Sequence, residues 1–135
     1  MKRDWNLLRH ILGIIELSRA NNLLNFPEAA YPIPQEIAKN YENQEEACQV
    51  ILEHVVLLHD ENFIEILEPG RNGTYSIISI FVIRLTASGH DFMDLSRENN
   101  HWENVKNKIV TSGGATTVAI ITQLLIAEAK QKLGL

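Results

Sequence analysis

The sequence predicts an α+β fold with additional helices at its C-terminal end, and three observations carry this prediction. Apolar residues recur at helical spacing in residues 4–20 and 43–62. Two β-rich runs then flank the step Asn72-Gly73, which favours a tight turn between two strands. Helical spacing resumes after residue 86. A chain of 135 residues is long enough to bury a core of its own.

Residues 4–20, DWNLLRHILGIIELSRA, are predicted to form the first helix. Asp4 can cap it, because its carboxylate can accept from backbone N–H groups of the first turn. The apolar stripe of this helix consists of Leu8, Ile11, Leu12 and Ile15. A proline-punctuated loop follows, and residues 34–41 are expected to form a short helix with Pro34 in its first turn.

A longer helix is predicted for residues 43–62. Asn43 and Glu46 have the spacing of a capping box, and Asn62 can end the helix in the left-handed conformation. The apolar stripe consists of Ala47, Ile51, Val55 and Leu58. Cys48 is the single cysteine, so no internal disulfide is expected. We interpret it as a small buried residue rather than a nucleophile.

Residues 63–85 are predicted to form a β-hairpin around Pro69–Gly73. Its second run is apolar on both faces near IFVI, so it is expected to be covered on both sides or to be a central strand. Thr86 follows this strand directly, and its hydroxyl can cap the next helix. That helix and its continuation present an apolar side made of Phe92, Met93, Leu95, Trp102, Val105 and Ile109.

Helix, short helix, helix, hairpin and helix is the order of elements in a winged helix. We therefore expect a winged-helix-like domain with three N-terminal helices and a hairpin wing. Residues 1–110 would hold this domain with the helix that follows the wing. Residues 111–135 would hold a C-terminal helix.

Three segments also resemble an uncharacterised family of bacterial and prophage proteins, catalogued as domain of unknown function 2513. They are MKRDWNLLRHIL, EHVVLLHDENFIE and RLTASGHDFMDLSRENNHWENVK. Two positions depart from the pattern: Ala87 stands where an aromatic residue often follows the threonine, and Glu61-Asn62 stands where Ala-Gly is frequent. The resemblance implies a winged-helix-like domain of unestablished function, and it carries over no catalytic residue.

The charge of the central segment indicates which kind of partner the chain can bind. Residues 28–68 contain ten acidic residues and one basic residue, Lys39, which gives this segment a net charge of −9. The segment includes the helix that would enter a DNA groove, and such a charge repels the phosphate backbone. We therefore favour a non-enzymatic protein-interaction module that binds a basic protein or mimics nucleic acid. Its candidate acidic face consists of Glu45, Gln49, Glu53 and Asp60.

A DNA-binding transcriptional regulator of phage or prophage origin is the alternative. Basic residues lie mainly at the two ends of the chain, and a non-standard DNA surface can be built from them. The candidate nucleic-acid contacts are Arg3, Arg9, Arg71 and Lys106.

An enzyme is a third hypothesis, with His90, Asp94 and His101 as its residues. His90 and Asp94 are one helical turn apart, but two ligands are too few for a catalytic metal site. The dipeptides His59-Asp60 and His90-Asp91 suggest an HD-type phosphohydrolase, but a hairpin separates them. The segment TSGGATT lacks the lysine and spacing of a phosphate-binding loop. We expect no enzymatic activity, no metal and no cofactor.

The last helix has more apolar residues than a narrow stripe needs: Val118, Ile121, Leu124, Leu125 and Ile126. It is expected to pack on the preceding domain or to form the seam of a homodimer, which we favour. No signal peptide or membrane span is expected, and the single cysteine fits a cytoplasmic protein.

Overall fold

The computed structural model describes residues 3–18, 23–67, 70–71, 77–111 and 116–134, with backbone only for 70–71. Two compact units divide the chain, Met1–His90 and Asp91–Leu135. The division expected after residue 110 stays a prediction.

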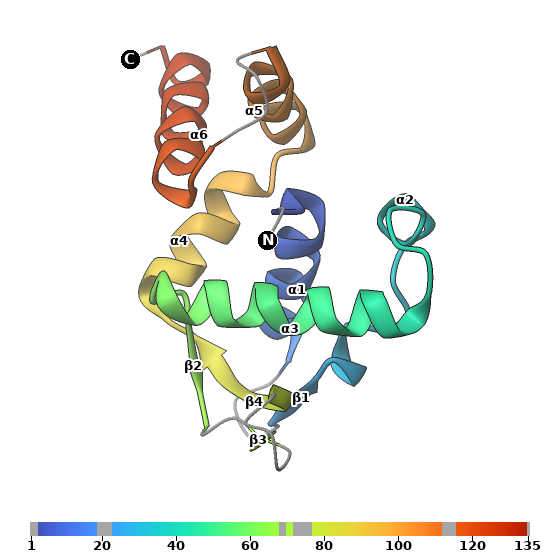
Figure 1. Cartoon of the computed structure of the whole chain (residues 1–135). Coiled ribbons are helices and arrows are strands. Elements are labelled where there is room, and N and C mark those ends of the chain that lie inside the picture. Colours follow the sequence, from blue (N-terminus) through green and yellow to red (C-terminus); the bar gives the residue numbers. More distant parts are fainter. Residues whose placement is uncertain (1–2, 19–22, 68–69, 72–76, 112–115, 135) are drawn as a thin grey trace. The chain divides into compact units, whose positions relative to one another are not determined.

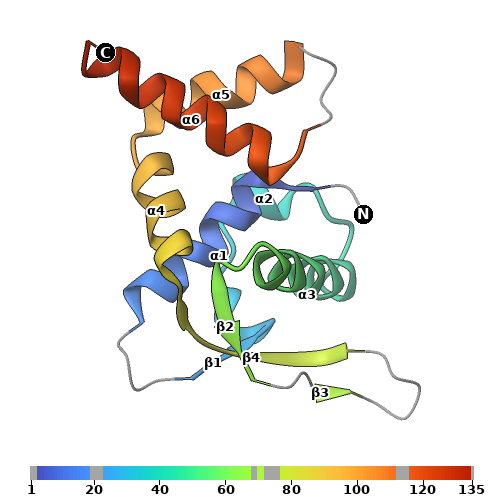
Figure 2. The same cartoon turned by 90° about the vertical axis from the view of Figure 1, so that its left-hand side faces the viewer.

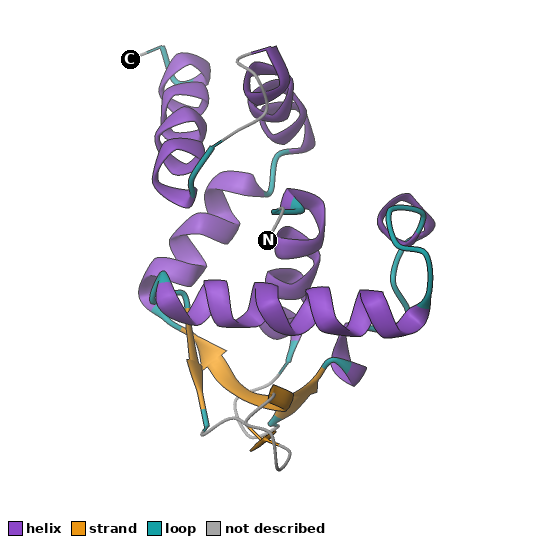
Figure 3. Ribbon diagram, in the orientation of Figure 1, coloured by secondary structure: helices purple, strands orange, loops and turns teal. Residues whose placement is uncertain are grey.

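Helices begin and end the described chain, and strands lie only in its N-terminal unit (Figure 3). The N-terminal unit holds α1 (Trp5–Leu17), β1 (Leu24–Phe26), a 3₁₀ turn (Glu28–Ala30), α2 (Gln35–Ala38), α3 (Gln44–Asp60), β2 (Ile64–Ile66), β3 (Gly70–Arg71) and β4 (Ile77–Leu85). Helix α4 (Ala87–Ser96) continues from it, and α5 (Asn99–Thr111) and α6 (Val118–Lys132) follow. The predicted α+β fold is confirmed, with three helices before the hairpin and additional helices after it.

Strand β4 is the centre of the sheet. It pairs antiparallel with β1 on one side and with β2 on the other, and β3 pairs with its first part. The predicted hairpin and the predicted central strand are therefore confirmed. The turn expected at Asn72-Gly73 lies outside the described residues.

One face of this sheet carries the core of the N-terminal unit. Helices α1 and α3 lie over it, as Figures 1 and 2 show from two directions. Ile80, Val82 and Leu85 of β4 are buried, whereas Phe81 is 37% exposed. Of the two predicted alternatives, β4 is therefore the central strand of the sheet, because both of its edges are paired.

Helix α1 forms as the sequence predicts, although it ends at Leu17. The Asp4 carboxylate accepts from the Leu7 N–H at 3.1 Å, which caps the helix. The four predicted stripe residues are buried, and Leu7 is buried with them. Burial of this stripe against the sheet and α3 stabilises the unit.

Strand β1 was not predicted. The prolines around it indicated a loop, but Leu24–Phe26 pairs with Ile80–Val82 of β4. Three residues are too few to show an alternating pattern in a sequence. The strand exists because β4 offers it a free edge, and Phe26 is fully buried as a result.

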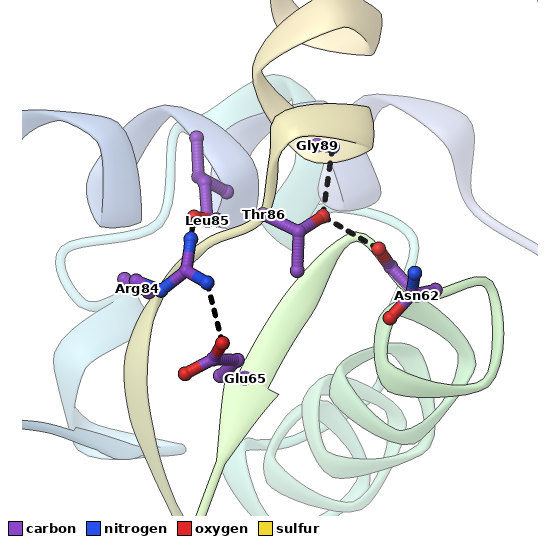
Figure 4. Close-up of polar contacts among 6 residues, drawn as sticks. All are labelled: Asn62, Glu65, Arg84, Leu85, Thr86 and Gly89. Atoms are coloured by element: carbon purple, nitrogen blue, oxygen red, sulfur yellow. Dashed lines mark hydrogen bonds and ion pairs between the residues drawn. The ribbon is translucent and has the colours of Figure 1, made fainter.

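A junction ties the end of α3 to the start of α4 (Figure 4). Asn62 takes a φ of 61°, so the predicted left-handed stop is confirmed. The Thr86 hydroxyl donates to the Asn62 carbonyl at 2.5 Å and accepts from the Gly89 N–H at 3.2 Å, which confirms the predicted cap. The Thr86 N–H also donates to the Phe63 carbonyl at 2.9 Å. On the neighbouring strands, Arg84 pairs with Glu65.

Gly89 is required by this junction. A Cβ atom added at position 89 would lie 2.1 Å from the carbonyl oxygen of Phe63. That carbonyl belongs to backbone and already accepts from Thr86, so it cannot move away cheaply. The close approach therefore explains why glycine stands three residues after the capping threonine.

The C-terminal unit consists of most of α4 and the paired helices α5 and α6. Trp102 of α5 is buried, and its ring meets Phe92 edge-on with 6.4 Å between centroids. Val105 and Ile109 are buried on α5, and Val118, Ile121 and Leu125 are buried on α6, which packs against α5.

We predict that Gly89→Ala lowers the free energy of unfolding by about 1–3 kcal/mol, because the new methyl group overpacks against the Phe63 carbonyl. Urea denaturation measures this. Gly13→Ala is the matched control, since nothing lies within 4 Å of its added Cβ. It should be neutral or stabilise α1 by up to about 1 kcal/mol. Similar losses in both variants would contradict the role given to Gly89.

Candidate interaction surface on helix α3

Helix α3 starts at a cap that uses two of its polar side chains. The Asn43 side chain accepts from the Glu46 N–H at 2.8 Å, as the capping-box spacing predicts. The Glu46 carboxylate reaches back to the N–H of Glu42 at 3.0 Å, one residue beyond the cap. Both contacts fix the first turn, and the acidic side chains there suit the positive end of the helix dipole.

The apolar side of α3 faces the sheet. The four stripe residues predicted from the sequence are buried, and so are Leu52, His54 and Leu57. The remaining side of the helix is left to the solvent. Its outward residues include the four of the predicted acidic face.

Three of those four residues line one shallow open groove of about 540 Å³. The groove lies along the first half of α3, and its lining consists of Asn43, Glu45, Glu46, Gln49, Val50 and Glu53. Asp60 does not line it, since it is the last residue of the helix, where it is exposed. The structure thus brings together Glu45, Gln49 and Glu53 and places Asp60 apart from them.

The groove is negatively charged without internal compensation. None of its lining residues is basic. Within the part of the chain that the structure describes, no hydrogen bond or ion pair engages the side chains of Glu45, Gln49 or Asp60. These groups serve no contact of the fold, in contrast to Asn43 and Glu46, which form the cap.

Behind the groove, α3 is held to the start of α1 by the buried side chain of His54. Its Nδ1 lies 2.8 Å from the carbonyl oxygen of Val50, and its Nε2 accepts from the N–H of Asp4 at 2.8 Å. Burial lowers the pKa of the imidazole, which therefore stays neutral near pH 7.

Asp4 gathers a second set of contacts at the same place. The Tyr41 hydroxyl donates to its carboxylate at 2.7 Å, so the segment between α2 and α3 is tied to α1 as well. Burial, followed by this hydrogen bond to a carboxylate, raises the pKa of the Tyr41 phenol well above its ordinary value. The hydroxyl remains a donor at every physiological pH.

Cys48 corrects one expectation. It is half-buried rather than buried, because it lies at the side of α3 where the helix meets the loop before α2. The Tyr31 hydroxyl is 3.4 Å from its sulfur. Burial and the neighbouring thiol together raise the pKa of Tyr31 to about 12.

The residues of the DNA-binding alternative are divided between the two units. Arg3 lies over the ring of Trp5, 5.9 Å from its centroid, and Arg9 is half-buried on α1. Lys106 belongs to the C-terminal unit and pairs with Glu103 at 3.0 Å. The side chain of Arg71 lies outside the described residues.

Basic residues of the C-terminal unit are largely neutralised by their neighbours. Four of its five arginine and lysine side chains form ion pairs: Arg97 with Asp94, Lys106 with Glu103, Lys108 with Glu128 and Lys132 with Glu98. The lysine partners lower the pKa values of Glu98 and Glu128 through hydrogen bonds. A phosphate backbone would have to compete with these carboxylates.

The residues of the enzyme hypothesis are also divided between the two units, with His90 in the first and Asp94 and His101 in the second. His101 lines an open groove of about 510 Å³ with Lys108, Glu128 and Lys132, and neither His90 nor Asp94 is part of that lining. Asp94 pairs with Arg97. Among the described residues, no group of three His, Cys, Asp or Glu side chains is placed to hold a metal ion. The absence of enzymatic activity stays a prediction.

The model of a family described as hypothetical proteins of domain of unknown function 2513 (DUF2513) matches residues 2–115. The chain belongs to this family. The match runs from the N-terminal unit through α5, and it ends before α6 begins. No curated protein and no solved structure gives a match. Within the described residues of this DUF2513 protein, no helix is long and apolar enough to cross a membrane.

Sequence reasoning on this DUF2513 protein missed two features of the site. The Asn43 and Glu46 side chains were assigned to the cap alone, but they also line the groove with Val50. The sequence also does not show whether His54 is buried, although a histidine within an apolar stripe often has two hydrogen-bond partners. Its partner Asp4 is 50 residues away, so no local pattern reveals it.

We predict that Tyr41→Phe lowers the free energy of unfolding by about 1 kcal/mol, because it removes a hydrogen bond to a carboxylate. Tyr31→Phe is the matched control and should cost less than about 0.5 kcal/mol, since sulfur is a weak hydrogen-bond partner. Urea denaturation of the two variants tests the difference. A larger loss for Tyr31→Phe would contradict the place of Asp4 at the centre of this junction.

Proposed function

We propose that this DUF2513 protein is a non-enzymatic protein-interaction module whose outward α3 face binds a basic partner. The single observation that supports this most is the groove lined by Glu45, Gln49 and Glu53, which contains carboxylates and no basic residue. Of these three, Glu45 and Gln49 make no hydrogen bond or ion pair among the described residues, so their side chains can bind another molecule. The same surface can compete with nucleic acid for a basic protein, as a mimic of its charge.

The composition of the groove fits long basic side chains. Val50 gives it an apolar spot, and Glu46 and Glu53 lie about one helical turn before and after Val50 on α3. The methylene stem of an arginine or lysine can lie on such a spot while its charged end meets a carboxylate. Charge complementarity of this kind speeds association and selects partners more than it raises affinity.

A DNA-binding transcriptional regulator of phage or prophage origin is the second candidate. The order of α1, α2, α3 and the β2–β4 hairpin favours it, since this is the order of elements in a winged helix. The helix that would enter the groove of DNA is then α3, which has an acidic outward face. Four of the five basic residues beyond residue 90 are already paired, so the phosphate contacts that normally supply affinity are few.

Fluorescence anisotropy with two probes tests both candidates. The first probe is a labelled peptide rich in arginine and lysine, and the second is a labelled mixed-sequence DNA duplex. We expect the chain to bind the peptide and not the duplex at low salt. The double variant Glu45→Gln/Glu53→Gln should weaken peptide binding at least fivefold.

The control for this test changes the net charge equally at exposed positions outside the groove. Glu36→Gln/Asp91→Asn should weaken peptide binding less than twofold. Equal losses in the two double variants would mean that net charge alone binds the peptide, and the α3 proposal would fail. Duplex binding that weakens steeply with salt would move the DNA-binding candidate to first place.

We also propose that the protein is a cytoplasmic homodimer whose seam includes α6. Ile126 lies on α6, and Leu133 is the C-cap residue of this helix, seven positions later and in the αR conformation, so both lie on the same side; they are 38% and 73% exposed. Exposed apolar residues in such a row favour association. Sedimentation equilibrium should give about twice the chain mass of 15.3 kDa.

The variant Ile126→Gln/Leu133→Gln should return the chain to a monomer. Val110→Gln changes an exposed apolar residue on α5 instead and should leave the dimer intact. At about 100 μM, a dimer with a Kd of about 1 μM is almost fully associated. An unmodified chain that is monomeric at this concentration would disprove the dimer.

A further inference from the structure

The hydrogen bonds of His54 fix its protonation state by geometry alone. The carbonyl oxygen of Val50 can only accept, so the Nδ1 atom that faces it must carry a proton. The backbone N–H of Asp4 can only donate, so the Nε2 atom that faces it must be unprotonated. The ring is fully buried, and no water can take the place of either partner without a rearrangement.

A second proton on this ring breaks one of the two contacts. It would sit on Nε2 and point at the N–H of Asp4 from 2.8 Å, with two donors facing each other. The charged groups around the ring are Asp4 and Arg3 at the start of α1 and Glu53 on α3 itself. The two carboxylates favour the second proton, whereas burial and Arg3 oppose it, and burial is the largest of these effects.

We propose that His54 and Asp4 form a proton-operated latch, in which protonation of His54 releases the first turn of α1 from α3 while the rest of the N-terminal unit stays folded. Release of Asp4 also frees Tyr41, whose hydroxyl donates to the Asp4 carboxylate. The segment between α2 and α3, which leads to the capped start of α3, then loses its tie to α1. The latch does not depend on the proposed function of the α3 face.

The remainder of α1 has contacts that survive in acid. His10 lies one turn further along, and its Nε2 is 2.8 Å from the carbonyl oxygen of Ala30. A carbonyl oxygen accepts from an imidazole N–H whatever the charge of the ring, so this contact does not need a neutral histidine. Ile11, Leu12 and Ile15 lie beyond the first turn, are buried and do not titrate. The first turn can therefore open without loss of the helix.

The direction of the pH dependence follows from the lowered pKa of His54. The unfolded chain takes up a proton below about pH 6.5, whereas the folded ring resists it. The contribution of the latch is therefore complete above about pH 6.5 and is lost as the pH falls through the folded pKa. Between about pH 6.5 and the folded pKa, the ratio of closed to open latch falls by up to about tenfold for each pH unit.

The test is an NMR titration of the full ¹⁵N-labelled chain from pH 7.5 to pH 4.5. Ring resonances report protonation of His54 and His10, and backbone amide resonances report the two contacts. We expect the amide of Asp4 to move with the midpoint of the His54 ring. Its protection from hydrogen exchange, corrected for the intrinsic rate, should fall at least tenfold, while amides of residues 11–15 keep theirs.

Two variants separate the latch from general acid unfolding. His54→Gln offers an acceptor that cannot be protonated, so the Asp4 amide should stay protected at pH 4.5. His10→Gln is the matched control and should open like the unmodified chain. If His54→Gln does not fold, the comparison of midpoints in the unmodified chain decides alone.

Two results would overturn the latch. One is an Asp4 amide that does not respond at the midpoint of the His54 ring. The other is a simultaneous loss of protection at Asp4 and at residues 11–15, which would mean that the whole unit unfolds in acid.

Discussion

The close approach of Gly89 to the carbonyl of Phe63 is the constraint on which the N-terminal unit depends most. At this point the left-handed Asn62 ends α3, β2 begins, β4 ends and α4 starts. The Thr86 hydroxyl and N–H satisfy the two carbonyls that the turn after α3 leaves without helical partners. A larger residue at position 89 would separate the two backbones and remove these bonds together. This contact therefore fixes the position of the hairpin relative to the end of α3.

Helix α3 is fixed at its other end by a different interaction. The cap at Asn43 and the contact of His54 with Asp4 hold its first half against α1. On the outer side, the cap engages Asn43 and Glu46, whereas Glu45 and Gln49 make no hydrogen bond or ion pair among the described residues. Acidic residues on that side therefore cost the fold little. Some side chains of α3 thus hold the fold together, and others point to the solvent. This arrangement supports an interaction role for Glu45, Gln49 and Glu53.

The sequence predicts those parts of the fold that arise from contacts three or four residues apart. The caps at Asp4, Asn43 and Thr86 are of this kind, and so are the apolar stripes of α1 and α3. Strand β1 could not be predicted, because its stability comes from pairing with β4 more than fifty residues later. The same reason hides the contact of His54 with Asp4. For the candidate site, the sequence predicted the negative charge of α3 and its exposed side. It did not predict the groove, because the lining of the groove includes side chains that form the cap.

The distribution of ion pairs separates acidic residues of the fold from acidic residues of a surface. In the C-terminal unit, Glu128 is 9% exposed and has the Lys108 ammonium at 2.9 Å, so its charge is used to hold α6 on α5. On α3, Glu45 is exposed and has no such partner among the described residues. Replacement of a paired, buried carboxylate such as that of Glu128 lowers the stability of the protein. Replacement of an exposed carboxylate such as that of Glu45 leaves the stability nearly unchanged. Variants of the α3 face should therefore fold normally, so that any loss of binding they show belongs to the surface itself.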